Sequence, residues 1–171
     1  MKIMKNNKNL YYSIITSSDR CAAGDMHDKS GELIEKIMKS SKFSLHSRVI
    51  LPDEFSLLEN QLIEFFDDER ISLILTTGGT GLSKRDVIPE VTEKLIERKI
   101  PGISEIMRIE SYKNNKMSIL SRSVSGVKNN TLIINLPGSP NAIQENLNIL
   151  ISSIEHAVEI IMDSHTGNHP Q

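Results

Sequence analysis

The sequence predicts a three-layer α/β/α sandwich built on a mostly parallel sheet, with one antiparallel strand in a hairpin. Strand-like and helix-like segments alternate through the first half of the chain, which is typical of parallel strands joined by right-handed crossovers. Residues 71–77 are apolar or β-branched at nearly every position, which favours a strand covered on both faces. Later in the chain, two strand-like segments are separated by a short connection that contains glycine, which indicates a hairpin.

Three strands and two helices are expected in the first half. Residues 10–16 form a β-rich run that ends in small polar residues, and residues 48–51 are the end of a second strand. The helix between them can be capped by Asp28 or by Ser30. The two helices have these apolar faces at helical spacing: Leu33, Ile34, Ile37 and Met38 in the first, and Phe55, Leu58, Leu62, Phe65 and Phe66 in the second.

The second half is less regular. Pro89 suits the first turn of a helix, which Pro101 and Gly102 interrupt before a further helix follows. Residues 119–124 and 131–136 are expected to be the paired strands of the hairpin.

The last helix has the clearest start signal in the chain. Ser139 can cap it, and Pro140 fits the first helical position, where the missing N–H of proline costs nothing. Its apolar face recurs at helical spacing and consists of Ile143, Leu147, Leu150, Ile154, Val158 and Ile161.

Length and composition indicate one domain. We expect residues 1–9 to be a flexible N-terminus, residues 10–162 to be the domain, and residues 163–171 to be a flexible tail. A net charge of −2 does not suggest a nucleic-acid-binding protein, and no apolar run approaches the ~20 residues that span a bilayer. The single cysteine, Cys21, excludes an internal disulfide and agrees with a reducing compartment, so we expect a cytoplasmic protein.

A glycine-rich loop, Gly78-Gly79-Thr80-Gly81, directly follows the third predicted strand. Ligands of open α/β sheets bind beyond the carboxyl ends of the strands, and backbone N–H groups in such a turn can form an anion site. The spacing matches neither G-x-x-x-x-G-K-[ST] nor G-x-G-x-x-G. The loop therefore predicts phosphate binding, and the alternative is a tight turn in which the glycines serve geometry only.

Two aspartates, Asp53 and Asp86, follow predicted strand ends. A carboxylate beside a phosphate site favours a bridging cation, and Mg²⁺ is commonly held by one or two carboxylates together with substrate phosphates. Two strand-end aspartates can share one such ion. The alternative is that each caps the helix after it, a position that aspartate fills well.

Other strand ends carry polar residues. Ser17, Ser18 and Asp19 follow the first strand, where they can bind phosphate or polar ring atoms or can satisfy the loop backbone. The turn 137–139 precedes a helix N-terminus that is able to hold an anion. Arg122 falls within a predicted strand, where an inward arginine requires an anion and the alternative is an exposed edge.

Five motifs occur in order along the chain: T-T-G-G-T-G at 76–81, R-D-V-I-P-E at 85–90, P-G-I-S-E-I-M-R at 101–108, I-L-S-R at 119–122 and T-L-I-I-N-L-P-G-S at 131–139. With these motifs the sequence resembles the MoaB/Mog family, and specifically its molybdopterin adenylyltransferases, which include the corresponding domain of gephyrin. The match is collinear from about residue 10 to 160. Two departures from the common D-V-T-P-E-A pattern, Ile88 and Val91, leave the carboxylate of Asp86 in place.

The resemblance implies a reaction and a set of residue roles. Molybdopterin and ATP would give adenylyl-molybdopterin and pyrophosphate with Mg²⁺, in a cytoplasmic homotrimer that works with other enzymes of molybdenum-cofactor assembly. Asp53 and Asp86 match the acidic residues that the family requires, and they would bind the metal. The glycine loop, Gly78, Gly79, Thr80 and Gly81, would hold the ATP phosphates. Molybdopterin would contact Ser17, Ser18, Asp19, Ser121, Pro137, Gly138 and Ser139.

Two other functions remain open at this point. One is a non-catalytic MoaB-type protein that binds molybdopterin or acts as a scaffold, although such a protein has no need to hold Mg²⁺. The other is molybdate insertion, which a related domain performs in larger proteins, but the extra domains expected for it are missing from this sequence.

Overall fold

The computed structural model describes residues 10–163, which form one six-stranded sheet in the order β2-β1-β3-β6-β5-β4. The predicted flexible segments 1–9 and 164–171 lie outside the described residues. The neighbours β2, β1, β3 and β6 are parallel, and β5 is antiparallel to both β6 and β4, which confirms the predicted sheet with one antiparallel strand in a hairpin. The strands are β1 (Leu10–Ser17), β2 (Phe43–Leu51), β3 (Ile71–Thr77), β4 (Arg98–Lys99), β5 (Ser125–Lys128) and β6 (Thr131–Leu136).

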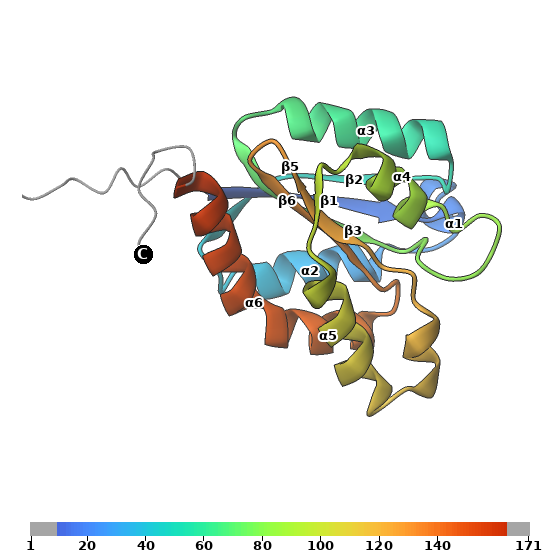
Figure 1. The fold of residues 1–171 in the computed structure, drawn as a ribbon. Helices are drawn as coiled ribbons and strands as arrows, with labels where there is room; N and C mark the ends of the chain where they lie inside the picture. Colours follow the sequence, from blue (N-terminus) through green and yellow to red (C-terminus); the bar gives the residue numbers. More distant parts are fainter. Residues whose placement is uncertain (1–9, 164–171) are drawn as a thin grey trace, which may run out of the picture.

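Helices cover both faces of the sheet, which gives three layers (Figure 1). One face packs against α3 and α4 in a core centred on Leu58, Ile74 and Val91. The other packs against α2, α5 and α6, with Leu75 and Leu147 in its core. The helices are α1 (Asp19–Ala22), α2 (Lys29–Met38), α3 (Phe55–Asp67), α4 (Ile88–Leu95), α5 (Pro101–Tyr112), the 3₁₀ turn η1 (Lys116–Leu120) and α6 (Pro140–Asp163).

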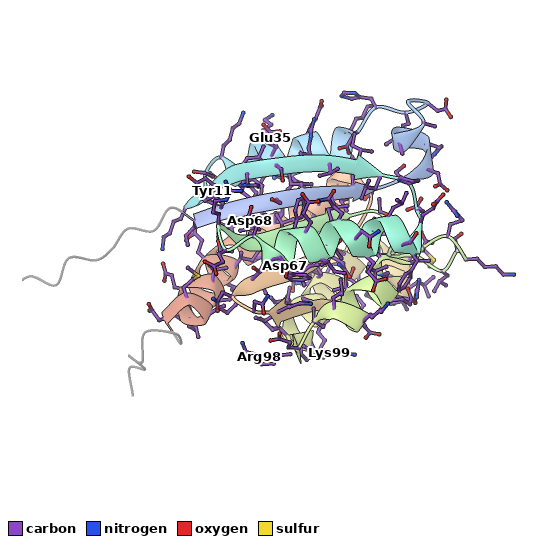
Figure 2. The ribbon with its side chains drawn as sticks, turned by 90° about the horizontal axis from the view of Figure 1, so that it is seen from above. Tyr11, Glu35, Asp67, Asp68, Arg98 and Lys99 are labelled. Carbon is purple, nitrogen blue, oxygen red and sulfur yellow. The ribbon has the colours of Figure 1, made fainter. Side chains whose placement is uncertain are left out.

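The two edges of the sheet differ in length and chemistry. Glu35 of α2 lies beside the β2 edge, where it pairs with Arg48, while Arg98 and Lys99 lie at the β4 edge (Figure 2). Edge strand β4 has only two residues, and both are exposed cations; short charged edges of this kind resist pairing with other chains. No helix within residues 10–163 is long and apolar enough to cross a membrane.

Elements with strong periodicity were predicted correctly. Strand β3 spans the predicted residues, and every one of its side chains is buried. The predicted apolar face of α6 is buried throughout its length, and the Ser139 hydroxyl accepts a hydrogen bond from the Ala142 N–H as its cap. Helix α2 begins at the predicted cap Asp28, whose carboxylate accepts the Gly31 N–H.

The prediction of a strand over residues 119–124 is wrong. Asn115 caps the turn η1 through the Met117 N–H, and the Ser118 hydroxyl donates to the carbonyl of Arg108. These local hydrogen bonds favour a turn, and pairing with β6 begins only at Ser125. The hairpin therefore exists, but its first strand is β5, and its tight connection is made by Asn129 with φ of 51° and Asn130.

A buried amide connects β6 to three other segments. The Asn135 side chain is fully buried, donates to the hydroxyls of Thr76 and Thr92, and accepts the backbone N–H of Val124. We expect Asn135→Ala to lower the free energy of unfolding by about 2–4 kcal/mol, because buried partners lose their hydrogen bonds and a cavity forms.

Urea denaturation measures this loss. The matched control is Asn148→Ala on α6, which removes an exposed amide that pairs with Gln144 and should change stability by less than about 0.5 kcal/mol. Equal stability of the two variants would contradict a structural role for the buried network.

Candidate functional site

The carboxyl ends of the four parallel strands meet at one edge of the sheet. Strand β1 lies between β2 and β3, so the chain reverses its direction across the sheet at β1. Such a reversal point is where ligands of open α/β sheets bind. The loops after β1, β3 and β6 touch there, and the Thr77 hydroxyl donates to the carbonyl of Pro137 at 2.8 Å.

The glycine loop needs its glycines for two reasons. Gly78 and Gly79 have φ values of +87° and +62°, which side chains other than glycine rarely adopt. A Cβ on Gly78 would also lie closer than 3.0 Å to the carbonyl oxygen of Ser17. On its other side, the Cβ position of Gly138 is 3.4 Å from the Gly78 Cα. The loop is thus packed between the ends of β1 and β6.

Asp53 points from the end of β2 to the glycine loop. Its carboxylate accepts the Ser17 hydroxyl at 2.5 Å and the Asp19 N–H at 3.1 Å. Its Oδ1 is 3.5 Å from the Cβ position of Gly79. Helix α3 is capped at Glu54 with no side-chain hydrogen bond, so the alternative that Asp53 caps this helix is wrong.

Asp86 lies on the same loop as the glycines. Its Oδ2 accepts the Ser83 N–H at 2.8 Å and is 2.9 Å from the Cβ position of Gly81. The cap of α4 is Val87, again with no side-chain hydrogen bond, so Asp86 does not cap that helix. The two aspartates that the sequence singled out therefore both lie against the glycine loop, one beside Gly79 and one beside Gly81.

A third carboxylate, Asp19, connects these parts. It accepts the Asp53 N–H at 2.9 Å and receives two hydrogen bonds from the Arg85 guanidinium, at 2.7 and 3.0 Å. The hydrogen bond from Arg85 and then the bond from the Asp53 backbone lower the pKa of Asp19. The hydrogen bond to Asp19 in turn raises the pKa of Arg85. Asp19 is therefore ionised at neutral pH and holds the loop after β3 to the start of α1.

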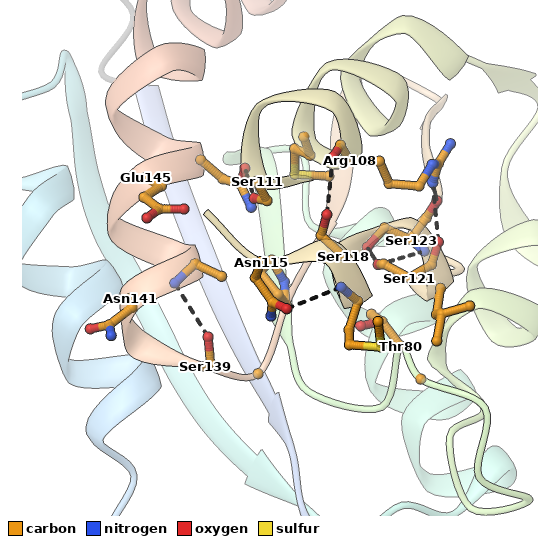
Figure 3. A pocket seen from close by; sticks show the side chains of 18 of the residues that line it. Thr80, Arg108, Ser111, Asn115, Ser118, Ser121, Ser123, Ser139, Asn141 and Glu145 are labelled. Atoms are coloured by element: carbon orange, nitrogen blue, oxygen red, sulfur yellow. Dashed lines mark hydrogen bonds between the residues drawn. The ribbon is translucent and has the colours of Figure 1, made fainter. Parts of the chain in front are cut away.

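A pocket of about 680 Å³ opens beside the glycine loop (Figure 3). Thr80 and Gly81 belong to both, so a ligand in the pocket can reach the loop. Of the residues predicted to contact molybdopterin, the pocket includes Ser121, Pro137, Gly138 and Ser139.

The remaining predicted contacts, Ser17, Ser18 and Asp19, lie outside the lining of this pocket. The Ser17 hydroxyl is bonded to Asp53, and the Ser18 hydroxyl accepts the Cys21 N–H as the cap of α1. The Ser18 hydroxyl thus satisfies the loop backbone, as the alternative proposed, whereas the Ser17 hydroxyl bonds a side chain. The role of both towards a ligand stays a prediction.

Sequence reasoning missed the other wall of the pocket, which α5, η1 and α6 supply. Ser111 and Asn146 meet there in a buried hydrogen bond of 3.1 Å, and Asn114 donates to Glu145. The sequence did offer one signal for this wall: Asn146 is a polar residue that falls on the apolar face of α6. These groups give the wall amide, hydroxyl and carboxylate functions suited to a polar heterocycle.

Asp53 and Asp86 are a suitable but incomplete ligand set for a divalent cation. Residues 10–163 contain no cluster of three or more His, Cys, Asp or Glu side chains able to hold a metal alone. Mg²⁺ is usually bound by one or two carboxylates, with substrate phosphates and water as further ligands. The two carboxylates beside the glycine loop fit that pattern.

Comparisons with known proteins agree with this geometry. Residues 13–156 match the family described as "Probable molybdopterin binding domain". The chain is 37% identical to the molybdopterin adenylyltransferase of Helicobacter pylori, over 95% of this chain and 91% of that protein. It is 39% identical to the Escherichia coli K12 protein of the same name, over 81% and 72% of the two chains.

A solved structure of a related protein has the same fold. The crystal structure of the molybdopterin biosynthesis enzyme MoaB from Thermus thermophilus aligns with a TM-score of 0.83 and 36% identity. The alignment covers 88% of this chain and 95% of that one. The chain therefore belongs to the molybdopterin-binding domain family of the MoaB and Mog proteins.

Proposed function

We propose that this protein is a Mg²⁺-dependent molybdopterin adenylyltransferase, which transfers AMP from ATP to the terminal phosphate of molybdopterin and releases pyrophosphate. One observation carries the proposal: a pocket large enough for a pterin shares Thr80 and Gly81 with a glycine loop that two carboxylates flank. Pocket, phosphate loop and carboxylates are the three parts that such a transfer needs. The names of the relatives support the same reaction.

The transfer requires two phosphates to meet. The pterin phosphate would attack the α-phosphorus of ATP, forming a P–O bond as the bond to the pyrophosphate oxygen breaks. Such reactions depend mainly on positioning and on neutralising charge, so no covalent nucleophile is needed. Mg²⁺ held by Asp53 and Asp86 would neutralise charge on the triphosphate.

The pocket offers a site for the pterin phosphate. Ser139 lies at the N-terminus of the 24-residue helix α6, where unpaired N–H groups and the helix dipole favour an anion. The hydroxyls of Ser121 and Ser123, which bond each other at 2.8 Å, lie in the pocket lining as well. We propose that this part of the pocket holds the phosphate and that the α5–α6 wall holds the ring.

The test is pyrophosphate release by the purified protein with ATP, Mg²⁺ and molybdopterin. We expect release only when all three are present. Tight molybdopterin binding without pyrophosphate release would instead favour the non-catalytic binding protein.

A pocket-filling variant tests the location of the pterin. Ala142 lines the pocket and is half-buried, so Ala142→Phe should weaken molybdopterin binding at least about tenfold by occupying its space. ATP binding should change little, because the glycine loop is untouched. Isothermal titration measures both affinities.

The matched control for that variant is Ser152→Phe, which adds the same side chain to an exposed position on the same helix, outside the pocket. Unchanged molybdopterin affinity in Ala142→Phe, with both variants folded, would place the pterin elsewhere.

We further propose that the protein is a cytoplasmic homotrimer. The resemblance to MoaB and Mog proteins supports the number of copies, and apolar side chains on α5 and η1 supply a surface for contact. Ile109, Met117 and Ile119 are each about 60% exposed there. Light scattering on the purified protein measures the number of copies.

The adenylylated product of the proposed reaction is a mixed phosphoric anhydride, so another enzyme of molybdenum-cofactor assembly must accept it.

A further inference from the structure

Arg122 holds the glycine loop at several points. It lies in the irregular segment between η1 and β5 and is half-buried. Its Nε donates to the carbonyl of Gly81 at 2.7 Å, and its Nη2 donates to the carbonyl of Asp86 at 2.6 Å. Its Nη1 pairs with the carboxylate of Glu90 in the first turn of α4. One guanidinium thus ties both ends of the segment 81–86 to α4.

The backbone of Arg122 adds a further contact, because its N–H donates to the carbonyl of Thr80 at 2.9 Å. In a trans peptide the C=O and the following N–H point in opposite directions, and residues 10–163 contain no cis peptide bonds. Fixing the carbonyls of Thr80 and Gly81 on Arg122 therefore turns the N–H groups of Gly81 and Leu82 away from it. Both of those residues line the pocket.

The neighbours of Arg122 belong to the pocket wall. Ser121 and Ser123 line the pocket, and the Arg108 guanidinium donates to both of their carbonyls at 3.3 and 3.4 Å. Arg122 therefore joins this part of the pocket wall to the glycine loop. A lysine offers one point charge and lacks the planar fork that reaches two carbonyls and a carboxylate together.

We infer that Arg122 is a positioning residue for adenylyl transfer, which fixes the loop N–H groups and the carboxylate of Asp86 relative to a pterin in the pocket. The inference rests on the proposed function. Arg122 acts through the loop and not by contact with the reacting atoms. Its loss should therefore reduce kcat and raise the Mg²⁺ concentration needed for half-maximal rate, while the affinity for molybdopterin stays nearly constant.

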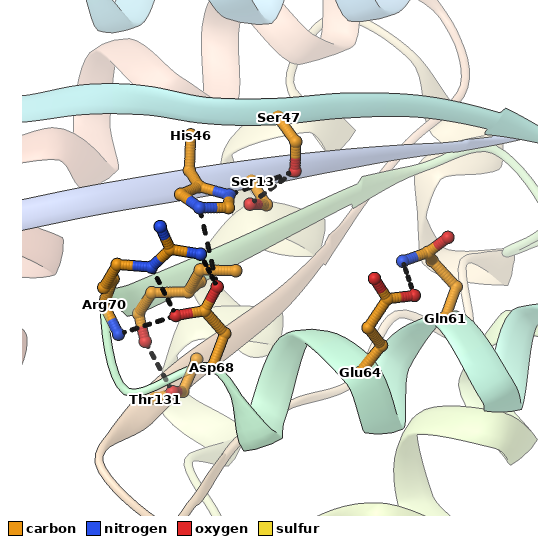
Figure 4. Close-up of polar contacts among 9 residues, drawn as sticks. Ser13, His46, Ser47, Gln61, Glu64, Asp68, Arg70 and Thr131 are labelled. Carbon is orange, nitrogen blue, oxygen red and sulfur yellow. Dashed lines mark hydrogen bonds and ion pairs between the residues drawn. The ribbon is translucent and has the colours of Figure 1, made fainter.

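The experiment compares Arg122→Ala, Arg122→Lys and the control Arg70→Met in pyrophosphate release. Arg70 is also paired, with two hydrogen bonds to Asp68 (Figure 4). It precedes the start of β3, whereas the glycine loop follows the carboxyl end of that strand. We expect kcat to fall at least about 30-fold in Arg122→Ala and about 10-fold in Arg122→Lys. Arg70→Met should stay within twofold of the unmodified protein.

Added guanidinium at millimolar concentration gives a second readout. It should restore at least a tenth of the lost kcat to Arg122→Ala and nothing to Arg122→Lys, whose side chain occupies the site. Folding is checked by circular dichroism, and if Arg122→Ala is unfolded, the folded Arg122→Lys variant decides the outcome.

Two results overturn the inference in distinguishable ways. Wild-type kcat and Mg²⁺ dependence in a folded Arg122→Lys or Arg122→Ala variant, with the unmodified protein active, would remove the positioning role alone. Absence of pyrophosphate release by the unmodified protein and by Arg70→Met would remove the proposed function, and the role of Arg122 with it.

Discussion

Asp86→Asn is expected to lower kcat for pyrophosphate release at least 100-fold, a rise of about 2.7 kcal/mol in the activation barrier. The carboxylate lies against Gly81 and, in the proposed reaction, shares a Mg²⁺ ion with Asp53. Asparagine has the same shape and can still accept the Ser83 N–H that binds Oδ2. The charge is lost while the loop hydrogen bond remains, so the free energy of unfolding should change by less than about 1 kcal/mol.

Parallel measurements separate chemistry from binding. Molybdopterin affinity should stay within about threefold, because the pocket includes Gly81 but not Asp86. Asp53→Asn should show a similar loss of kcat. The double variant should lose little more than either single variant, since the proposed reaction uses one ion for both carboxylates. Additive losses in the double variant would contradict a shared ion.

The matched control for the charge change is Asp68→Asn. Asp68 sits near the amino end of β3, opposite the site, where hydrogen bonds from Arg70 hold its pKa near 2. Its replacement should leave kcat unchanged. A wild-type kcat in Asp86→Asn would refute the metal role of that carboxylate.

Gly78→Ala is expected to produce the largest loss of stability among glycine substitutions in the loop, about 3 kcal/mol or more. A non-glycine residue at φ of +87° costs about 1–3 kcal/mol, and the new Cβ would also overlap the backbone oxygen of Ser17. That oxygen cannot rotate away as a side chain can. The strands β1 and β3 would have to separate at the site, so ATP binding should fall as well.

Two other glycines separate the causes of that loss. Gly24 has a similar φ of +81° but open space around its Cβ position, so Gly24→Ala should cost about 1 kcal/mol. Gly102, in the first turn of α5, has open space and no positive φ, so its alanine variant should be neutral or slightly stabilising. Urea denaturation ranks the three, and a Gly78→Ala loss no larger than that of Gly24→Ala would exclude the steric overlap.

Periodicity predicted most of the fold. A continuous apolar run identified β3, and helical spacing with a serine–proline start identified α6, because both patterns reflect burial that the structure confirms. The strand predicted over residues 119–124 does not form, because side-chain hydrogen bonds of Asn115 and Ser118 stabilise a 3₁₀ turn there. Short elements such as α1 and β4 escaped prediction because four and two residues are too few to show a period.

The spatial arrangement at this sheet edge was predicted where it depends on strand ends and missed where it depends on tertiary contact. Asp53 and Asp86 follow strands, and the glycine loop has a distinctive composition, so sheet topology alone brings them to one edge. The pairing of Arg122 with carbonyls of that loop joins residues 36 to 41 positions apart, which no local pattern encodes. The same holds for the wall residue Asn146, which meets Ser111 across two helices.

Following the phosphorus atoms of ATP tests the proposed transfer most directly. The protein would be incubated with molybdopterin, Mg²⁺ and ATP labelled with ³²P at either the α- or the γ-phosphate, and the pterin product would be isolated. Adenylyl transfer predicts that the α label appears in the pterin and the γ label only in pyrophosphate, with neither transfer in Asp86→Asn. Label from the γ-phosphate in the pterin, or no transfer from either position while molybdopterin binds, would contradict it.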